Sequence, residues 1–301
     1  MKKTNITNYK KESWIGLLYI TPWIIGFLIF TMYPIVASFY LSFTDYDLLN
    51  APVMVGIDNF KKIFGDKEFL KALGVTGKYV FIVVPLKLAF SLFVAFILNM
   101  RLKGINFFRT AYYIPSILGS NVAIAILWKF IFSTEGLVNQ VLGVINVAPI
   151  SWFGQPTPAL FTIALLRVWE FGSTMVIFLA ALKEVPADLY EAASVDGSNK
   201  FRNFFNITIP IITPVIFFNF IMQLIHAFQE FNAPYLVTSG GPMKGTYLLP
   251  MLIYDHTFKY YNMGYASAMS WILFIIIMTF TLITFRSSKY WVFYNDNGGE
   301  S

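Results

Sequence analysis

Six apolar segments, each long enough to cross a lipid bilayer, constrain this chain more than any other feature. A membrane-spanning helix needs roughly 20 mostly apolar residues, and runs of about this length recur between short polar stretches. The fold class expected is therefore all-α, a polytopic membrane protein with six transmembrane helices. The predicted spans cover residues 14–43, 72–99, 108–132, 159–182, 207–228 and 264–285. The first is over-long and contains Pro34, which predicts a kink.

The composition excludes several classes of protein. Only 13% of the residues are charged, whereas soluble domains have about 25%. The net charge of +6 does not indicate nucleic-acid binding, because the basic residues lie in short loops between apolar segments. The absence of cysteine excludes disulfides, iron–sulfur clusters and a catalytic thiol, and two histidines argue against a His-based metal centre.

The distribution of Lys and Arg predicts the topology, because cytoplasmic loops of membrane proteins are enriched in basic residues. Twelve such residues fall on one side of the six spans: Lys2, Lys3, Lys10, Lys11, Arg101, Lys103, Arg109, Lys183, Lys200, Arg202, Arg286 and Lys289. Six fall on the other side: Lys61, Lys62, Lys67, Lys71, Lys244 and Lys259. We therefore expect a multi-pass cell-membrane protein with both termini in the cytoplasm.

The domain organisation follows from this topology. Residues 1–13 are predicted to be a cytoplasmic segment, 14–290 the six-helix membrane domain and 291–301 a polar tail. In the outer loops, the stretch within residues 45–71 predicts a short amphipathic surface helix. Gly240, Gly241 and Pro242 predict a tight turn after the fifth span.

The motifs of catalysis are missing from the sequence. It contains no G-x-x-x-x-G-K-[ST] loop for ATP phosphates, no G-x-S-x-G nucleophile elbow and no H-E-x-x-H zinc motif. We therefore expect no catalytic residue, no metal site and no cofactor in this chain. If ATP drives its function, a partner chain must bind the nucleotide.

Polar residues inside the spans are the first candidates for a binding site, because burying them in lipid is costly. The fifth span and its outer end carry four, spaced by 4, 3 and 4 residues on one predicted helical face: Asn219, Gln223, His226 and Glu230. They either line a hydrophilic pathway or hydrogen-bond to neighbouring helices.

The fourth span contributes a second polar group. Arg167 and Glu170 are three residues apart, and one interpretation is that they form an ion pair. Alternatively, Trp169 stacks on a sugar ring while Glu170 binds hydroxyl groups. Lys87 in the second span is an isolated charge that snorkels, faces a cavity or meets an acidic group on another chain.

The loop between the fourth and fifth spans carries the most specific signal. Residues 191–210 read EAASVDGSNKFRNFFNITIP, a charged stretch that predicts a helix, a turn at Gly197 and a second helix. Together with its position, this stretch resembles the EAA loop of ATP-binding-cassette (ABC) importer permeases. The stretches FFRTAYYIPSILGSNVAIAILWKFIF and AFQEFNAPYLVTSGGP resemble the carbohydrate branch, in particular its MalF/UgpA-like first subunit in a six-span form.

The resemblance implies a MetI-like, type I importer architecture and four kinds of partner. These are a second similar permease, two cytosolic ATPases that hold ATP and Mg, an extracellular solute-binding protein and a sugar or oligosaccharide. By position, the residues implied to couple to an ATPase are Glu191, Ala192, Ala193, Asp196 and Gly197, within the loop 184–206. The predicted contact for the binding protein comprises Ser239, Gly240, Gly241 and Pro242.

Three other classes compete with this interpretation. An ion-coupled secondary transporter requires an intramembrane carboxylate and no docking loop. A membrane-embedded enzyme lacks a catalytic group in this sequence, and a channel has no use for a docking loop. The sequence does not identify the sugar, the ATPase or the role of Lys87.

Overall fold

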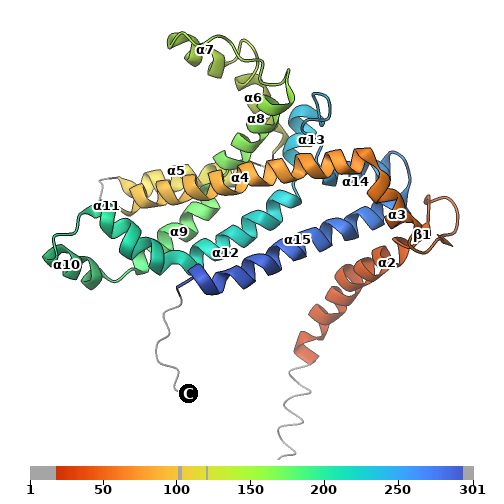
Figure 1. Cartoon of the computed structure of the whole chain (residues 1–301), viewed down its shortest axis with the longest axis horizontal. Coiled ribbons are helices and arrows are strands. Elements are labelled where there is room, and N and C mark those ends of the chain that lie inside the picture. The colour runs from red at the N-terminus through yellow and green to blue at the C-terminus, as the bar shows by residue number, and fades with distance from the viewer. Residues whose placement is uncertain (1–17, 101–103, 120, 294–301) are drawn as a thin grey trace, which may run out of the picture. The chain divides into compact units, whose positions relative to one another are not determined.

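The computed structural model describes residues 18–100, 104–119 and 121–293, and nearly all of its regular secondary structure is helical (Figure 1). Four helices in this part are long and apolar enough to cross a membrane singly. Two further pairs of helices pass the same test when each bent pair is counted as one span, which gives the six predicted spans. The predicted segment 1–13 and most of the predicted tail 291–301 lie outside the described residues.

The chain divides into two units, and the first contains residues 1–65 and 253–272. Its described part begins with the helix Leu18–Leu41. A π-helical turn at Leu28–Met32 comes directly before α2 (Tyr33–Leu41), whose first turn contains Pro34. The irregularity predicted at Pro34 thus takes the form of a π-helical turn, a common cause of bending in long helices.

A short hairpin and a surface helix complete the N-terminal part of this unit. The antiparallel strands β1 (Thr44–Asp45) and β2 (Val53–Met54) are a small exception to the predicted all-α fold. The helix α3 (Asp58–Gly65) follows. Its buried Asn59 donates hydrogen bonds to the carbonyl oxygens of Ser42 and Thr44, at 3.0 and 2.8 Å, and so fixes α3 against the hairpin.

The predicted surface helix within residues 45–71 is only partly correct. The helix α3 ends at Gly65, and the remaining residues begin α4 (Lys67–Asn99). The side chain of Asp66 accepts a hydrogen bond from the backbone N–H of Glu68 and caps α4. A new helix therefore starts at Lys67, and the second span is longer than predicted.

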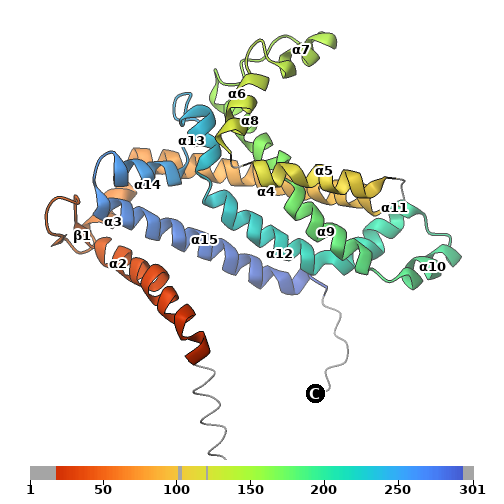
Figure 2. The same cartoon turned by 180° about the vertical axis from the view of Figure 1, so that it is seen from behind.

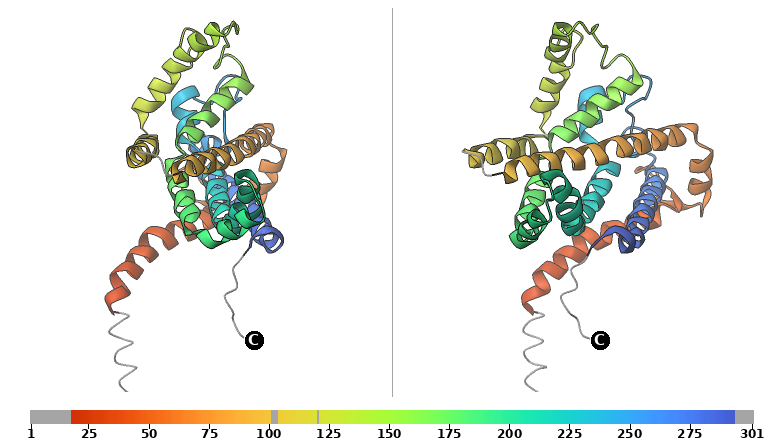
Figure 3. Two further views of the ribbon diagram at one scale, coloured as in Figure 1. Left: turned by 90° about the vertical axis from the view of Figure 1, so that its left-hand side faces the viewer. Right: turned by 60° about the vertical axis from the view of Figure 1, so that its left-hand side comes forward.

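The second unit contains residues 66–252 and 273–301, with α4 at its centre. The helix α4 runs across α8 (Pro156–Trp169), α9 (Gly172–Glu184) and α12 (Ile209–Phe228), as Figure 3 shows. Leu98, Met175, Phe178 and Ile212 are at most 2% exposed and join α4, α9 and α12 in one apolar core. This core holds the polar groups described below.

The last helix, α15 (Met263–Trp291), ends against α12 in the second unit. The rings of Phe217 and Phe285 meet edge to face, with centroids 5.1 Å apart. Directly after α15, Val292 is buried beside Phe217, and the backbone N–H of Phe293 donates to Thr213 at 2.8 Å. The first residues of the predicted polar tail are therefore packed against α12.

Two predicted spans are pairs of helices rather than single helices. The third comprises α5 (Ile105–Leu118) and α6 (Val122–Ile131), whose axes differ by 104°. The side chain of Asn121 caps α6 by accepting from the N–H of Ala123. The fourth comprises α8 and α9, bent by 49° at residues 170–171. Hydropathy does not reveal these breaks, because it averages over a whole apolar segment. Whether side chains pair with the backbone groups at one position does not affect it.

The loops on the predicted outer side contain three helices that the sequence analysis did not predict: α7 (Leu137–Val144), α13 (Asn232–Thr238) and α14 (Leu249–Phe258). In α7, the buried Asn139 ties the loop together. Its amide donates to the carbonyl of Ile150, and its oxygen accepts from the N–H of Ile150 and the indole of Trp152. These contacts depend on tertiary structure, which explains why hydropathy missed them.

Candidate functional site

The loop between the fourth and fifth spans has the predicted helix–turn–helix form. It consists of α10 (Ala187–Val195), a turn and α11 (Lys200–Asn203), and lies at one end of the pair α9 and α12 (Figures 1 and 2). Gly197 has φ +72°, a left-handed conformation that favours glycine. The N–H of Ser198 donates back to the carbonyl of Ala193 at 3.0 Å, which closes the end of α10.

Side chains make this loop rigid. The Oγ of Ser198 donates to Asn203 Oδ1 at 2.5 Å, and Asn199 Oδ1 accepts from the N–H of Arg202 at 2.8 Å. The hydroxyl groups of Tyr190 and Thr208 are hydrogen-bonded at 2.8 Å and join α10 to the start of the fifth span. The loop therefore has a fixed shape before any partner binds.

The second helix of the loop is continuous with the fifth span. The helix α11 continues through the π-helical turn Phe204–Thr208 directly into α12. The loop is thus joined to the fifth span by a continuous helical backbone.

The predicted coupling residues lie at the surface of this loop. Glu191, Ala192, Asp196 and Gly197 are exposed, and Ala193 is half-buried. Exposed apolar side chains surround them, with Val195 at 87% and Phe201 at 74% exposure. Apolar groups on a rigid, exposed loop are typical of a protein-binding surface.

A second group of predicted residues meets inside the protein, around Arg167 at the end of α8. Its Nη1 lies 2.6 Å from Glu170 Oε2, its Nη2 2.7 Å from Glu230 Oε1 and its Nε 2.5 Å from Glu230 Oε2. All three side chains are at most 13% exposed. The predicted pairing of Arg167 with Glu170 is confirmed, and Glu230 is an additional ion-pair partner.

We call Arg167, Glu170 and Glu230 the ion-pair cluster. Glu230 also accepts a hydrogen bond from the N–H of Ala233 at 2.9 Å and thereby holds the first turn of α13. The charge of Lys87, on α4, lies within electrostatic range of all three members. Lys87 is therefore not isolated from the other charged groups of this chain.

The break between α8 and α9 lies next to this cluster. Ser116 on α5 donates to the carbonyl of Glu170 at 3.3 Å and accepts from the N–H of Ser173 at 3.0 Å. Ser91 on α4 lies 3.4 Å from the carbonyl of Phe171. These hydroxyls satisfy backbone groups that a continuous helix would have paired, which allows a break within a membrane span. The sequence analysis did not single out either serine.

The other predicted pathway residues are in varied surroundings. The amide of Asn219 is buried and donates to the carbonyl of Val215 on its own helix, whereas Gln223 donates to Thr174 on α9 at 3.1 Å. The side chain of His226 is exposed. The hydrogen bond of Gln223 matches the alternative that these residues link neighbouring helices.

Trp169 lies apart from these polar contacts. Its ring packs on Trp128 of α6, with centroids 6.0 Å apart. Trp169 remains half-buried, so one part of the indole is accessible in this chain.

The predicted turn at Ser239–Pro242 follows α13. Ser239 is exposed, Gly240 is buried with φ +83°, and the carbonyl of Gly241 accepts from Thr246 Oγ1 at 2.7 Å. Two contacts join the next residues to the start of α4: Lys71 Nζ donates to the carbonyl of Met243 at 2.8 Å, and Lys244 pairs with Glu68. The turn is therefore held in place.

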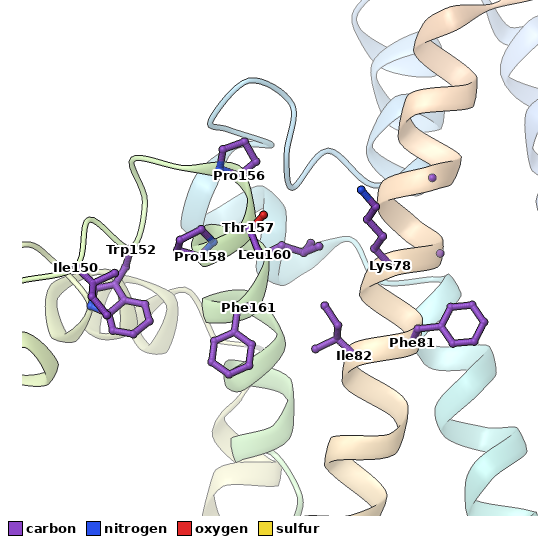
Figure 4. A pocket seen from close by; sticks show the side chains of 12 residues that line it. Lys78, Phe81, Ile82, Ile150, Trp152, Pro156, Thr157, Pro158, Leu160 and Phe161 are labelled. Atoms are coloured by element: carbon purple, nitrogen blue, oxygen red, sulfur yellow. The ribbon is translucent and has the colours of Figure 1, made fainter. Parts of the chain in front are cut away.

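A groove of about 840 Å³ lies between α4 and the segment that leads into α8 (Figure 4). Phe81 and Ile82 of α4 and Trp152, Leu160 and Phe161 opposite make it mainly apolar, and the Lys78 ammonium group stands at its edge. The sequence analysis did not predict this groove, because its walls come from residues about 80 positions apart.

Comparison with known proteins decides between the classes of function. Residues 105–292, which include the loop and the ion-pair cluster, match the family of binding-protein-dependent transport system inner membrane components. The chain belongs to this family. It is a permease, the inner-membrane component of a transport system.

Relatives of the permease match almost its whole length. It is 48% identical to the probable ABC transporter permease protein YesP of Bacillus subtilis, over 98% of this chain and 96% of YesP. It is 32% identical to the trehalose/maltose transport system permease protein MalF of Thermococcus litoralis, over 95% of this chain and 98% of that protein.

A solved structure confirms the fold. The permease superimposes with a TM-score of 0.81 on a chain of a bacterial ABC transporter involved in the import of alginate, an acidic polysaccharide. The match covers 94% of this chain and 98% of the other, at 22% identity. The predicted ABC-importer permease architecture is therefore correct.

Proposed function

We propose that this permease forms half of the membrane pathway of an ATP-driven importer for a sugar or oligosaccharide. The exposed, internally fixed loop around Glu191 and Gly197 carries this proposal, because a chain without an ATP-binding motif needs a rigid surface for an ATPase. The 32% identity to a trehalose/maltose permease along nearly the whole chain supports a saccharide as the substrate class.

The proposal includes the partners. A second, similar permease completes the pathway, two ATPases hold ATP and Mg in the cytoplasm, and a binding protein delivers the sugar from outside. The family's dependence on a binding protein supports the last of these. We call residues 184–206 the coupling loop. The distribution of basic residues supports cytoplasmic termini and a cytoplasmic position of this loop.

The test of docking uses two substitutions in the coupling loop. Gly197→Val forces a β-branched residue into a conformation that costs an L-residue roughly 1–2 kcal/mol, and Glu191→Lys reverses an exposed charge. We expect both to abolish uptake of radiolabelled maltooligosaccharides or other screened sugars and stimulation of the ATPase, while the permease pair still assembles. Ser194→Ala, on the same helix, is the control. Undiminished uptake in both variants contradicts the docking function.

The test of the pathway uses cysteines, since the chain has none of its own. The pathway is proposed to include Asn219, Gln223, His226, Glu230, Trp169 and Glu170. The exposed His226→Cys should react with a water-soluble thiol reagent in the assembled importer, because reaction requires contact with water. Complete protection of His226→Cys in the assembled importer contradicts a pathway on this face.

The turn Ser239–Pro242 is the proposed contact for the binding protein. Its fixed backbone and its exposed Ser239 support this role. Scrambling these four residues should weaken binding-protein-stimulated ATP hydrolysis, and normal stimulation would contradict the contact.

An ion-coupled transporter is the alternative that the residues themselves allowed. Such a mechanism needs an intramembrane carboxylate that is free to bind a cation. Glu170 and Glu230 are both ion-paired with Arg167, and the family match favours the ATP-driven class. Uptake that needs ATP and resists a protonophore would agree with our proposal, and the opposite result would favour the alternative.

A further inference from the structure

The ion-pair cluster lies where two membrane segments on either side of the coupling loop end. Glu170 lies just before α9, separated from it by Phe171, and Glu230 lies just after α12, separated from it by Gln229. The helix α9 leads into the loop and α12 leads out of it. The helices α9 and α12 with the loop between them thus form a hairpin (Figures 1 and 3). Arg167 joins the two ends of this hairpin that lie farthest from the loop.

The hairpin is also held along its length. Near the loop, Tyr190 bonds to Thr208 at 2.8 Å. In the middle, Phe178 and Leu182 of α9 share a buried core with Ile212 of α12. Nearer the cluster, Gln223 donates to Thr174 at 3.1 Å. Polar contacts at both ends and an apolar core between them leave no point at which the helices can separate easily.

The bond between Arg167 and Glu230 restricts direction as well as distance. Nη2 of the guanidinium donates a hydrogen bond to Glu230 Oε1 at 2.7 Å, and Nε lies 2.5 Å from Oε2 without forming a hydrogen bond. A charge-assisted hydrogen bond of this kind is directional, whereas contacts between apolar side chains are not. The cluster is at most 13% exposed, so water does not screen it effectively.

The same carboxylate reaches beyond the hairpin. Glu230 Oε1 accepts from the N–H of Ala233 in the first turn of α13, and α13 leads to the turn Ser239–Pro242. When the hairpin moves, this hydrogen bond therefore pulls α13 in the same direction. The helix α13 also packs on α6 and α8.

We infer that Arg167 is a positioning residue that makes the coupling loop, α9, α12 and α13 move as one body. Movement of the loop by an ATPase is then transmitted to the far end of the hairpin without loss. This inference rests on the proposed docking of the loop to an ATPase.

The test follows a reporter at the far end of the hairpin. Gln229, the exposed residue at the end of α12, is replaced by cysteine in the complete importer, reconstituted with its ATPases and binding protein. The rate of reaction with a membrane-impermeant thiol reagent is measured without nucleotide and after trapping with Mg-ATP and vanadate. With the cluster intact, we expect the two rates to differ by about fivefold or more, the range of typical allosteric coupling.

The main variant neutralises the whole cluster: Arg167→Met, Glu170→Gln and Glu230→Gln together. Removing all three charges avoids leaving a buried charge without a partner. We expect the nucleotide-dependent difference at Gln229→Cys to fall below about twofold, and the amount of trapped nucleotide is measured in parallel. Glu230→Leu, which keeps the Arg167–Glu170 pair, is a second variant with the same expected loss. Lys61→Met, which removes an exposed ion pair, is the control and should change nothing.

The outcomes separate this inference from the function on which it rests. A full response in the neutralised variant and in Glu230→Leu overturns the role of Arg167, as does an unchanged reporter rate in the otherwise native importer. Gly197→Val tests the docking itself and should abolish the response by preventing it. A response that survives Gly197→Val contradicts the proposed docking function. If Gly197→Val abolishes the response but the cluster variants keep it, the docking function stands and the inference about Arg167 is wrong.

Discussion

The coupling loop and the ion-pair cluster are rigid for opposite reasons. The loop is exposed, and its turn is held by hydrogen bonds between neighbours in sequence, such as Ser198 with Asn203 and Asn199 with Arg202. The cluster is buried, and Glu230 reaches it from 63 residues away. The surface that we propose to fit a partner is thus built locally, while the buried cluster is built from distant segments.

This difference has a consequence for mutations. A change in the loop affects a partner's fit and leaves the core intact, because the altered side chains face water. A change in the cluster leaves a charge or a cavity inside the protein and lowers the free energy of unfolding. Three substitutions test this contrast.

The largest loss of stability is expected for Arg167→Met. It leaves Glu170 and Glu230 buried without a cation in contact, and breaking a buried ion pair costs about 3–5 kcal/mol. Thermal denaturation of the purified permease pair should show a marked decrease in melting temperature. Glu191→Lys, an equally drastic change in the exposed loop, serves for comparison. Equal melting temperatures of the two variants would refute the contrast.

A smaller loss is expected for Gly172→Val at the start of α9. A Cβ atom there would lie 2.6 Å from the carbonyl oxygen of Tyr112 and 2.8 Å from Ser116 Oγ. Overpacking of this kind costs about 1–3 kcal/mol. The matched control is Gly77→Ala, because no atom lies within 4 Å of a Cβ at Gly77. If both variants have the melting temperature of the native protein, the close approach of α5 and α9 is not required for stability.

The smallest effect is expected for Tyr190→Phe, which removes only the hydroxyl group that bonds to Thr208. The loss of such a bond costs about 1 kcal/mol. The melting temperature should hardly change, whereas amide hydrogen exchange in α10 should become faster. Ser194→Ala, whose Oγ bonds only to the carbonyl of Glu191 within α10, is the control. Unaltered exchange in Tyr190→Phe would show that the loop does not need this anchor.

The amino-acid sequence by itself determined the membrane class, the six spans and the coupling loop. Apolar runs of about 20 residues leave a chain little choice but to cross a bilayer as helices. The turn at Gly197 was predictable because its determinants are neighbours: a helix-forming stretch, a glycine and the capping residue Asn199. The pairing of Arg167 with Glu170 was predictable for the same reason, since a separation of three residues brings two side chains together on a helix.

Only the tertiary structure decided the rest. It joined Glu230 to Arg167, brought Lys87 within range of both carboxylates, and placed Ser116 and Ser91 at the break between α8 and α9. None of these pairs has a short separation in sequence. A hydroxyl group or a charge within an apolar run becomes informative only when its partner is known. In a membrane that partner must be another protein group, because no water is available to replace it.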